Sequence, residues 1–489
     1  MRAAPGFLAR PALVLAALTS AVALAALLVA LALPAHAASR APAVSPSPTD
    51  TLRLSLEDAV SLALTRGVTV GLASSEVQRA RGQVREAEAV ALPQINTTGT
   101  YQRRFASIFS GVPADSGLGS LFANSPFGAE NQFTLELTGT QLLFSRSVGA
   151  AVSGARWYQH GVEHQLQDVE SQVVYQTRGA YLLAAYIGEL VRIAEEGVVQ
   201  ARANEHDVKL LFDQGARAEY DYLQAQVEAR NAEPPVMQAR NAFADALYGL
   251  KKLLNVPAEQ PMTLTTPLAF PGDQAPVVET DSLGAATRAA LLAAEAAVEV
   301  RKRAVTYESG ARWPELSASG TMLQEAFPSN GWPTRDQFFR DVTASAKLTL
   351  PIFQGFRTEG AVARAKAELR SAELNRDQVK LQVDIDVEQA RQDLNRALTV
   401  LAARRGTVEL AQRTWQLART RYDNGMATQL EVSDARLKML TSQADAADAL
   451  RAYRTSLARL EFALGHPPAT RLVSLDDITE HISREVLKR

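Results

Sequence analysis

The sequence predicts an α+β membrane protein composed of two copies of one unit, each with two strands and two long helices. Three observations support this fold class. The chain repeats itself at an offset of 210 residues, which is the separation between Gly215 and Gly425. Apolar residues recur with heptad spacing over long stretches, and other short segments alternate apolar with polar residues. Self-similarity at a fixed period indicates that one supersecondary unit is used twice.

The repeat also predicts where the parts of the chain begin and end. Segment 211–226 returns as segment 421–436, with a glycine at the same place in both copies. We therefore predict a signal segment at 1–37, repeat 1 at 38–280 and repeat 2 at 281–489. Within each repeat the expected order is a helix, a pair of strands, a long helix, a reversal and a returning helix, followed by a linker or tail.

The first residues have the composition of a secretory signal. Arg2 and Arg10 precede a long apolar run, which ends in the small-residue cleavage pattern Ala35-His36-Ala37. The run is long enough to serve as an uncleaved anchor, but the Pro/Ser-rich stretch that follows favours cleavage. No other stretch has the length and apolar character of a transmembrane helix, which excludes a polytopic inner-membrane transporter.

Composition excludes several classes of protein. The chain has no cysteine, so a disulfide framework, a thiolate nucleophile and an acylated lipoprotein N-terminus are excluded. A net charge of −2 argues against a nucleic-acid partner. There is no phosphate loop, cofactor fingerprint or Ser/His/Asp set with recognisable spacing. We therefore expect no catalytic residues, no cofactor and no enzyme.

One motif could indicate a metal site. His160, Glu163 and His164 fit the pattern H-x-x-E-H, which can place two zinc ligands on one helix face with a glutamate base. The motif stands in a heptad helix, with Val162 in the apolar seam, and no third group of ligands follows it. A short motif without its structural context is weak. We expect no bound metal there.

Four segments have the alternation expected of strands, at about 94–105, 132–144, 315–327 and 341–353. In each, one face is apolar and the other polar, and a length of about ten residues is typical of outer-membrane barrel strands. A soluble antiparallel sheet with one wet face is the alternative. Trp313 stands at one end of the strands. Aromatic residues gather at the other end, where an interfacial girdle would lie: Tyr101, Phe105, Phe109, Phe327, Trp332, Phe338 and Phe339.

The number of strands predicts an oligomer. Membrane barrels have about eight strands at least, so four cannot close one alone. Open strand edges cannot remain in lipid, because unpaired backbone groups have no water to bind there. If these strands span a membrane, several chains must contribute to one barrel.

The segments 147–214 and 356–424 are predicted to be very long helices, with returning helices at 217–255 and 427–464. Apolar residues follow a 3.5-residue seam in both, from Val162 to Leu211 and from Val383 to Tyr422. Such spacing indicates left-handed supercoiling, and at 1.5 Å per residue each helix is roughly 100 Å long.

An ordinary two-stranded coiled coil is the alternative for these helices, but it would leave the second face polar. Small residues off the seam favour further helices on that face: Ala180, Ala184, Ala185, Ala402 and Ala403. Pro234-Pro235 interrupts the first returning helix where the second copy has Ala444-Asp445, so we expect a bend or break there.

In these features the chain resembles the TolC-like outer-membrane efflux proteins (outer membrane factors) over essentially its whole length after the signal segment. Any one match is modest, but their order, spacing and duplication are specific. The matches are the x-Pro-x-Ile/Leu strand entries at Pro93 and Pro314, the strand exit Leu350 to Gly355, the reversals at Gly215 and Gly425, and the Tyr-x-x-Gly pattern with its following acidic-Val pair at Tyr422 to Val432.

The resemblance implies a homotrimer with a twelve-stranded transmembrane β-barrel in the outer membrane and a periplasmic α-barrel of coiled-coil helices. It implies passive conduction of substrates from an inner-membrane pump and a periplasmic adaptor, which dock at the inner end of the tunnel. Within this class, the alternative function is that of the outer-membrane duct of a type I protein secretion system or of a metal efflux system. A periplasmic coiled-coil scaffold is the alternative from another class.

The resemblance also assigns roles at the two reversals. Glu431 and Asp434 match the acidic positions that form rings at the channel constriction, and they lie one helical turn apart. Two stacked anionic rings would favour cations. Carboxylates at a helix start are also favoured by the helix dipole, which is the alternative explanation.

Asp221 and Tyr422 match positions that hold the closed state. The basic residue that usually accompanies this tyrosine falls at Ala427, so the closed state would lose one contact or replace it with Arg217 or Arg421. The reversal loops are the expected adaptor-docking tips, at Gly215, Ala216, Gly425 and Met426.

Overall fold

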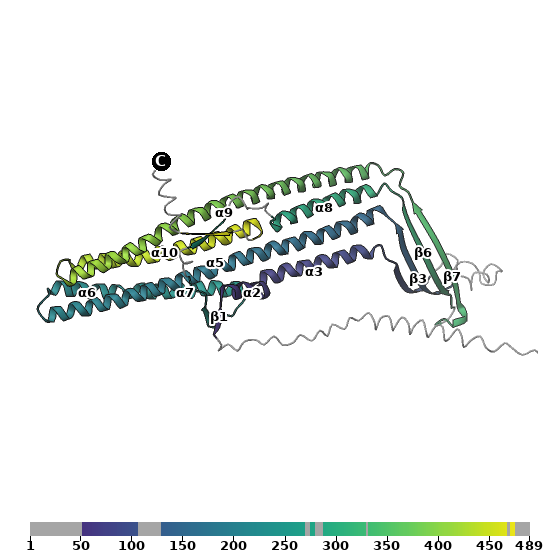
Figure 1. Ribbon diagram of the computed structural model, residues 1–489. Helices are drawn as coiled ribbons and strands as arrows, with labels where there is room; N and C mark the ends of the chain where they lie inside the picture. Colours follow the sequence, from purple (N-terminus) through teal and green to yellow (C-terminus); the bar gives the residue numbers. More distant parts are fainter. Residues whose placement is uncertain are drawn as a thin grey trace, which may run out of the picture. The chain divides into compact units, whose positions relative to one another are not determined.

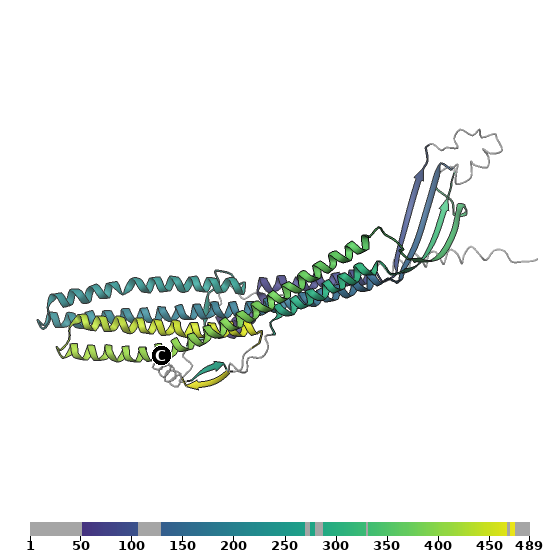
Figure 2. The same ribbon diagram turned by 90° about the horizontal axis from the view of Figure 1, so that it is seen from above.

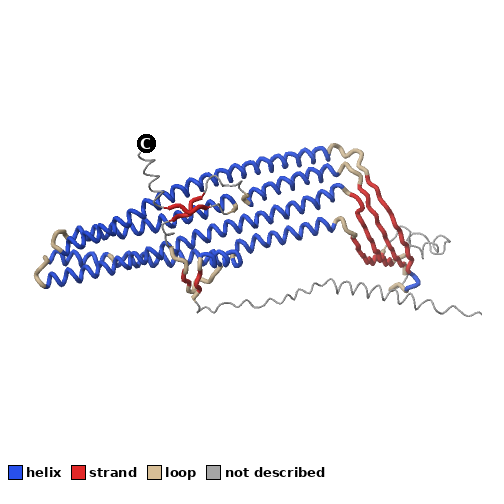
Figure 3. Tube along the Cα trace, in the orientation of Figure 1, coloured by secondary structure: helices blue, strands red, loops and turns tan. Residues whose placement is uncertain are grey.

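The computed structural model describes residues 51–105, 129–268, 274–278, 287–328, 331–466 and 470–474. The predicted signal segment at 1–37, Phe109 and most of the tail after His466 lie outside these residues. Helices make up most of the described chain, and the remaining ordered elements are strands (Figure 3). No helix among these residues combines the length and apolar character needed to cross a membrane.

The principal sheet has four antiparallel strands in the order β2 (Gln94–Arg103), β3 (Asn131–Phe144), β6 (Glu315–Ala326) and β7 (Phe338–Thr349). Three of them lie within two residues of the bounds expected from alternation. The fourth starts and ends earlier than the expected 341–353, because it runs from Phe338 to Thr349. Pro314 and Pro351 stand just beyond the last ladder pair, Glu315 with Thr349, and proline cannot donate to a ladder.

The register keeps one face of this sheet apolar across all four strands. Tyr101 pairs with Phe133, Leu137 with Met322, and Met322 with Val342. Residues that pair directly point to the same face, so these side chains share one side of the sheet. The opposite side carries polar pairs: Thr98 with Glu136, Thr138 with Thr321, and Ser319 with Ser345, whose hydroxyls are 2.8 Å apart.

Aromatic rings gather at the loop end of the strands. The centroids of Tyr101 and Phe133 are 4.7 Å apart, and those of Phe133 and Trp332 are 5.4 Å apart. Phe327 and Phe339 form a further pair at 6.3 Å. This is the end of the strands where alternation and composition predicted an aromatic girdle.

Two helices run most of the length of the helical part, α5 (Arg146–Asp213) and α9 (Arg357–Asp423), close to the predicted 147–214 and 356–424. Shorter helices pack beside them (Figure 1). These are α2 (Leu56–Arg66), α3 (Val68–Ala89), α6 (Glu219–Asn231), α7 (Glu233–Leu254), α8 (Ala289–Gly310) and α10 (Gln429–Leu464), with a 3-10 turn η2 (Arg335–Gln337) in the β6–β7 connection.

The helices follow the same order as the strands. Near the sheet, α3 contacts α5, α5 contacts α8, and α8 contacts α9. Along the chain, α3 precedes β2, α5 follows β3, α8 precedes β6, and α9 follows β7. Toward the reversals, α6 and α7 lie on one side of α5, and α10 lies between α5 and α9. Sheet and helices therefore form one layer of four columns with two open sides.

The heptad seam is buried more regularly in α9 than in α5. Val383, Ala390, Leu394 and Leu401 of the α9 seam are all buried. In α5, the seam residue Leu183 is 41% exposed. Because α5 packs against several helices, its buried residues do not follow a single seam. Those buried residues include Tyr181, Leu182 and the small residue Ala184. Of the small residues expected to admit a second helix, Ala184 and Ala402 are buried, whereas Ala403 is exposed.

The first returning helix is broken where the prolines predict it. α6 ends at Asn231 and α7 begins at Glu233, with Pro234 and Pro235 in the first turn of α7. Ala232 between them keeps right-handed helical torsions (φ −76°, ψ −19°). The backbone path therefore stays helical, and what the prolines remove is the backbone hydrogen bonds that their N–H groups would have donated. α10, which lacks the prolines, is continuous.

Short strands outside the main sheet tie distant segments together. β1 (Leu52–Leu54) pairs with β4 (Met262–Leu264), and the hydroxyl of Tyr181 donates to the Leu54 carbonyl at 3.0 Å. β5 (Gln274–Val278) pairs antiparallel with β8 (Thr470–Ser474), the teal and yellow arrows of Figure 2. Alternation did not predict these four strands, because they are too short to show a period.

Candidate functional site

Both reversals end a long helix with the same hydrogen-bonding motif. After α5, the N–H groups of Gly215 and Ala216 donate to the carbonyls of Phe212 and Leu211, both at 2.8 Å. After α9, Gly425 and Met426 repeat the pattern at 2.9 and 2.8 Å. This is the Schellman motif, and the glycines supply its left-handed residue with φ of +74° and +73°. The expected docking tips are therefore tight, exposed turns.

Tyr422 lies at the end of α9 inside the cluster of side chains that joins the two reversals. It is 5% exposed and packs with Val208, Ala225 and Val432. Its hydroxyl has no hydrogen-bond partner in the described part of the chain. Burial raises the pKa of the phenol, so the side chain stays neutral through the physiological range.

Arg217, from the opposite reversal loop, contacts Tyr422 twice. Its guanidinium carbon is 4.2 Å from the centre of the tyrosine ring, and its Nη2 donates to the Tyr422 carbonyl at 2.9 Å. Arg421 donates instead to the carbonyl of Met426 in its own loop, at 3.2 Å. Of the two arginines named as replacements for the basic residue absent at Ala427, Arg217 is the one that joins the two reversals.

Asp221 lies in the first turn of α6, close enough for its charge to raise the pKa of the Tyr422 hydroxyl. Arg217 has the opposite effect on that pKa, and burial outweighs both. The structure therefore brings Asp221, Arg217 and Tyr422 into one charged neighbourhood. No hydrogen bond joins Asp221 to the hydroxyl, which is unpaired as stated above.

Glu431 is exposed and forms a capping box at the start of α10. Its backbone N–H donates to Thr428 Oγ1 at 3.3 Å, and the Thr428 N–H donates to Glu431 Oε1 at 3.3 Å. This pairing satisfies backbone donors at the helix start, so the residue has a structural role that requires no channel.

Asp434 is also exposed, one turn further along α10. Lys438 donates to its carboxylate at 2.7 Å. Sequence analysis missed this lysine, which offsets part of the charge of any ring that Asp434 would form. The two acids do lie on neighbouring turns of the same helix, as expected.

A polar cluster that sequence analysis missed joins α6 to α10. Glu228 accepts hydrogen bonds from Ser433 and, at 3.0 Å, from Arg436. The side chains of Glu228 and Arg436 are only 19% and 14% exposed. Their positions in the sequence could have predicted this contact. Glu228 and Arg436 stand at similar distances after Gly215 and Gly425, so reversals that lie side by side bring them together.

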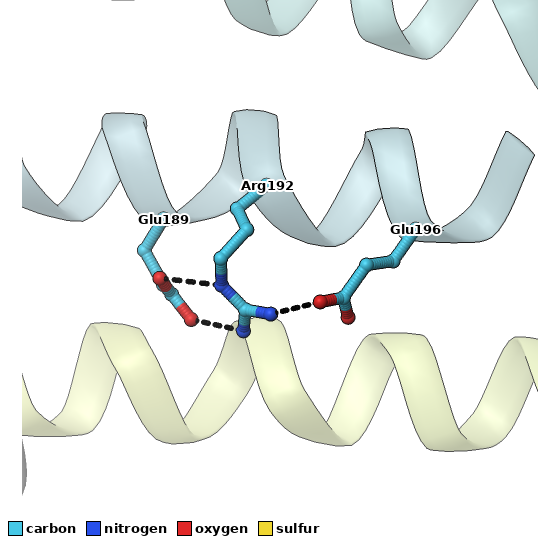
Figure 4. Close-up of polar contacts among 3 residues, drawn as sticks. All are labelled: Glu189, Arg192 and Glu196. Atoms are coloured by element: carbon cyan, nitrogen blue, oxygen red, sulfur yellow. Dashed lines mark hydrogen bonds and ion pairs between the residues drawn. The ribbon is translucent and has the colours of Figure 1, made fainter. Parts of the chain in front are cut away.

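A groove of about 740 Å³ runs beside this cluster, between α5, the α6–α7 break and α10. Ile193, Pro235 and Leu437 are among its apolar lining residues. On α5, Arg192 spans Glu189 and Glu196, with its Nε donating to Glu189 at 3.0 Å (Figure 4). Hydrogen bonds to Glu189 raise the pKa of Arg192, so the guanidinium stays charged and stiffens this stretch of helix.

The two histidines of the H-x-x-E-H motif contact different side chains. His160 Nδ1 lies 3.5 Å from Glu163, and His164 instead contacts Gln167 at 3.1 Å. A hydrogen bond from Gln159 lowers the pKa of Glu163, whose carboxylate also faces Arg81. Within the described residues, no three His, Cys, Asp or Glu side chains come together as metal ligands would.

Comparison with known proteins agrees with this architecture. The family described as Outer membrane efflux protein matches residues 59–256 and 283–466. Protein CyaE of Bordetella pertussis is 26% identical over 377 residues, which cover 74% of this chain and 75% of CyaE.

Solved structures show the same fold. CusC matches with a TM-score of 0.69 at 19% identity, covering 84% of this chain and 92% of that chain. The Campylobacter jejuni CmeC outer membrane channel matches with a TM-score of 0.69 at 17% identity, covering 88% and 89%. The family match extends over most of the sequence and falls in both of the predicted repeats. This chain belongs to the outer membrane efflux protein family.

Proposed function

We propose that this chain forms, as a homotrimer, the exit duct of a tripartite efflux pump. Its family gives the outer-membrane efflux role. The observation that supports the assembly is the open four-stranded sheet, which has one apolar face. Among the described residues, the outer edges of β2 and β7 have no partner strand. Edges of this kind must be paired if the sheet lies in lipid.

Three chains would supply enough strands and helical columns to close both layers. Each strand of the sheet is joined directly to one helix, which precedes or follows it in the chain. Pairing β7 with β2 of the next chain would therefore also bring α9 beside the next α3. Three copies give twelve strands, within the range of about 8 to 26 known for such barrels. Two internal repeats in each chain would then become six in the closed assembly.

The duct conducts passively, and its helical tip is the gate. In the closed state Arg217 joins the α5–α6 reversal to the end of α9 through Tyr422. Asp221 adds a carboxylate to the same neighbourhood. Opening separates the two reversals and breaks these contacts. A periplasmic adaptor binds the exposed turns at Gly215-Ala216 and Gly425-Met426, and an inner-membrane pump delivers the substrate.

Glu431 and Asp434 form the anionic rings of the constriction in this proposal. Glu431→Gln with Asp434→Asn should lower the preference for cations and weaken block by multivalent cations, because the rings lose their charge. These substitutions retain oxygen acceptors for Thr428 and Lys438, so the helix start is preserved. Reversal potentials in a salt gradient measure the change. The control is Glu409→Gln, which removes the charge of an exposed acid on the neighbouring helix α9. Unchanged selectivity in the double variant would remove the ring assignment.

The assembly itself is tested with purified protein. We expect a trimer by light scattering in detergent, fractionation with the outer membrane, and ion conductance in planar bilayers. A periplasmic scaffold would instead stay soluble without detergent and would not conduct. A monomer or dimer that conducts would contradict the proposed closure by three chains.

A further inference from the structure

A cavity of about 590 Å³ lies where the sheet joins the helices. We call it the junction cavity. The start of α5, the end of α8, the loop from β7 into α9 and the first turns of α9 all contribute to it. Its lining residues include Ser147, Tyr307, Glu308, Gln354, Arg357 and Arg364.

The wall between α5 and α8 is closely packed. Ser147 Oγ donates to the Tyr307 carbonyl at 3.0 Å. A Cβ on Gly310 would lie 2.5 Å from Ser147 Oγ and 2.8 Å from its backbone nitrogen, so only glycine fits there. The junction cavity therefore has one fixed wall, against which a ligand could be held without reordering the helices.

The other side of the junction cavity carries more positive than negative charge, because Arg357 and Arg364 face the single lining carboxylate, that of Glu308. Arg357 donates to the Gln354 side chain at 3.1 Å and forms no ion pair with a carboxylate in the described part of the chain. Arg364 pairs with Glu308 at 3.1 Å. At the border, Arg146 stacks on Trp313 at 4.6 Å, also without an acidic partner among the described residues.

An apolar rim continues from the junction cavity toward the sheet. In the single chain, Leu350, Ile352, Phe353 and Phe356 are all exposed, and Ile352 reaches 94%. Trp313 is half exposed on the α8 side. Large apolar side chains that remain exposed next to unpaired arginines are typical of the boundary between lipid tails and headgroups.

We propose that the junction cavity binds the phosphate of an anionic phospholipid in the periplasm-facing leaflet of the outer membrane. This rests on the proposed function only for the position of the bilayer. Arg357 and Arg364 contact the phosphate oxygens with their planar N–H groups. The side-chain oxygen of Gln354 accepts from Arg357, so its amide N–H groups supply a further donor to the phosphate. The acyl chains lie over Ile352 and Phe353. That rim is why the ligand is a lipid and not a free anion.

The test compares lipids on the purified full-length protein by native mass spectrometry, with phosphatidylglycerol and phosphatidylcholine as probes. The wild-type protein should retain phosphatidylglycerol in preference to phosphatidylcholine. Arg357→Gln with Arg364→Gln should weaken that retention about 25-fold, since a basic residue near a membrane surface contributes about fivefold. Arg370→Gln is the matched control: it lies on the same helix, pairs with Glu373 at 3.1 Å, and lies outside the cavity. It should retain the lipid as wild type does.

Two further measurements distinguish the sources of failure. Displacement of phosphatidylglycerol by inorganic phosphate alone would overturn the lipid assignment in favour of a free-anion site. Equal retention of both lipids by wild type, or full retention by the double variant, would also overturn it. Conductance in pure phosphatidylcholine bilayers tests the duct separately: lipid preference without conductance contradicts the proposed function, and conductance without lipid preference contradicts the junction site.

Discussion

Arg217→Ala should make the closed channel leak, with a rise in single-channel conductance or open probability of more than tenfold. The variant loses a cation–π contact and a charged hydrogen bond to the Tyr422 carbonyl in each chain. Together these contribute roughly 2 kcal/mol or more, and about 1.4 kcal/mol already changes an equilibrium tenfold. Planar-bilayer recordings of the purified channel measure the effect.

Arg421→Ala is the matched control for this prediction. The two arginines flank the same cluster, but Arg421 bonds only to Met426 of its own loop and does not bridge the reversals. Its conductance should stay near that of wild type. Tyr422→Phe should also retain the closed state, because the ring and carbonyl that Arg217 contacts remain and the hydroxyl lost has no partner. An equal rise in Arg421→Ala would show that net charge, and not the bridge, holds the tip closed.

Arg436→Met should lower the free energy of local opening of α6 away from α10 by up to about 3 kcal/mol. The substitution leaves the Glu228 carboxylate mostly buried with only the Ser433 hydroxyl as partner. Removing one member of a buried pair costs about 3 to 5 kcal/mol, and the partial exposure of this pair places it at the lower end. Hydrogen exchange of the α6 amides should therefore quicken by up to about a hundredfold.

The double variant Glu228→Leu with Arg436→Met separates an ion pair from simple packing. Two apolar side chains of similar size can replace a buried pair at little cost, so protection of α6 should largely return. Arg451→Met is a control on α10, because its partner Asp448 is half exposed and belongs to the same helix. If the double variant exchanges as fast as Arg436→Met alone, the single effect arises from lost packing of the arginine stem.

Much of this architecture follows from local periodicity. Alternation predicts the strands, apolar spacing predicts the heptad seam of α9, and the two glycines predict the reversals. Each depends on residues close together in the chain. Where one helix packs against several partners, the period blurs, and Leu183 is consequently exposed although the seam predicts it buried.

Periodicity in the sequence predicts which residues share a face, where the chain reverses, and that four strands need partners. Which distant residues meet is known only from the packing of the helices. Arg217 and not Arg421 contacts Tyr422, Glu228 meets Arg436, and Ser147 closes against Gly310. The reason is physical: a period reports the face that a residue occupies, whereas a contact across more than a hundred residues depends on how two helices are aligned along their axes.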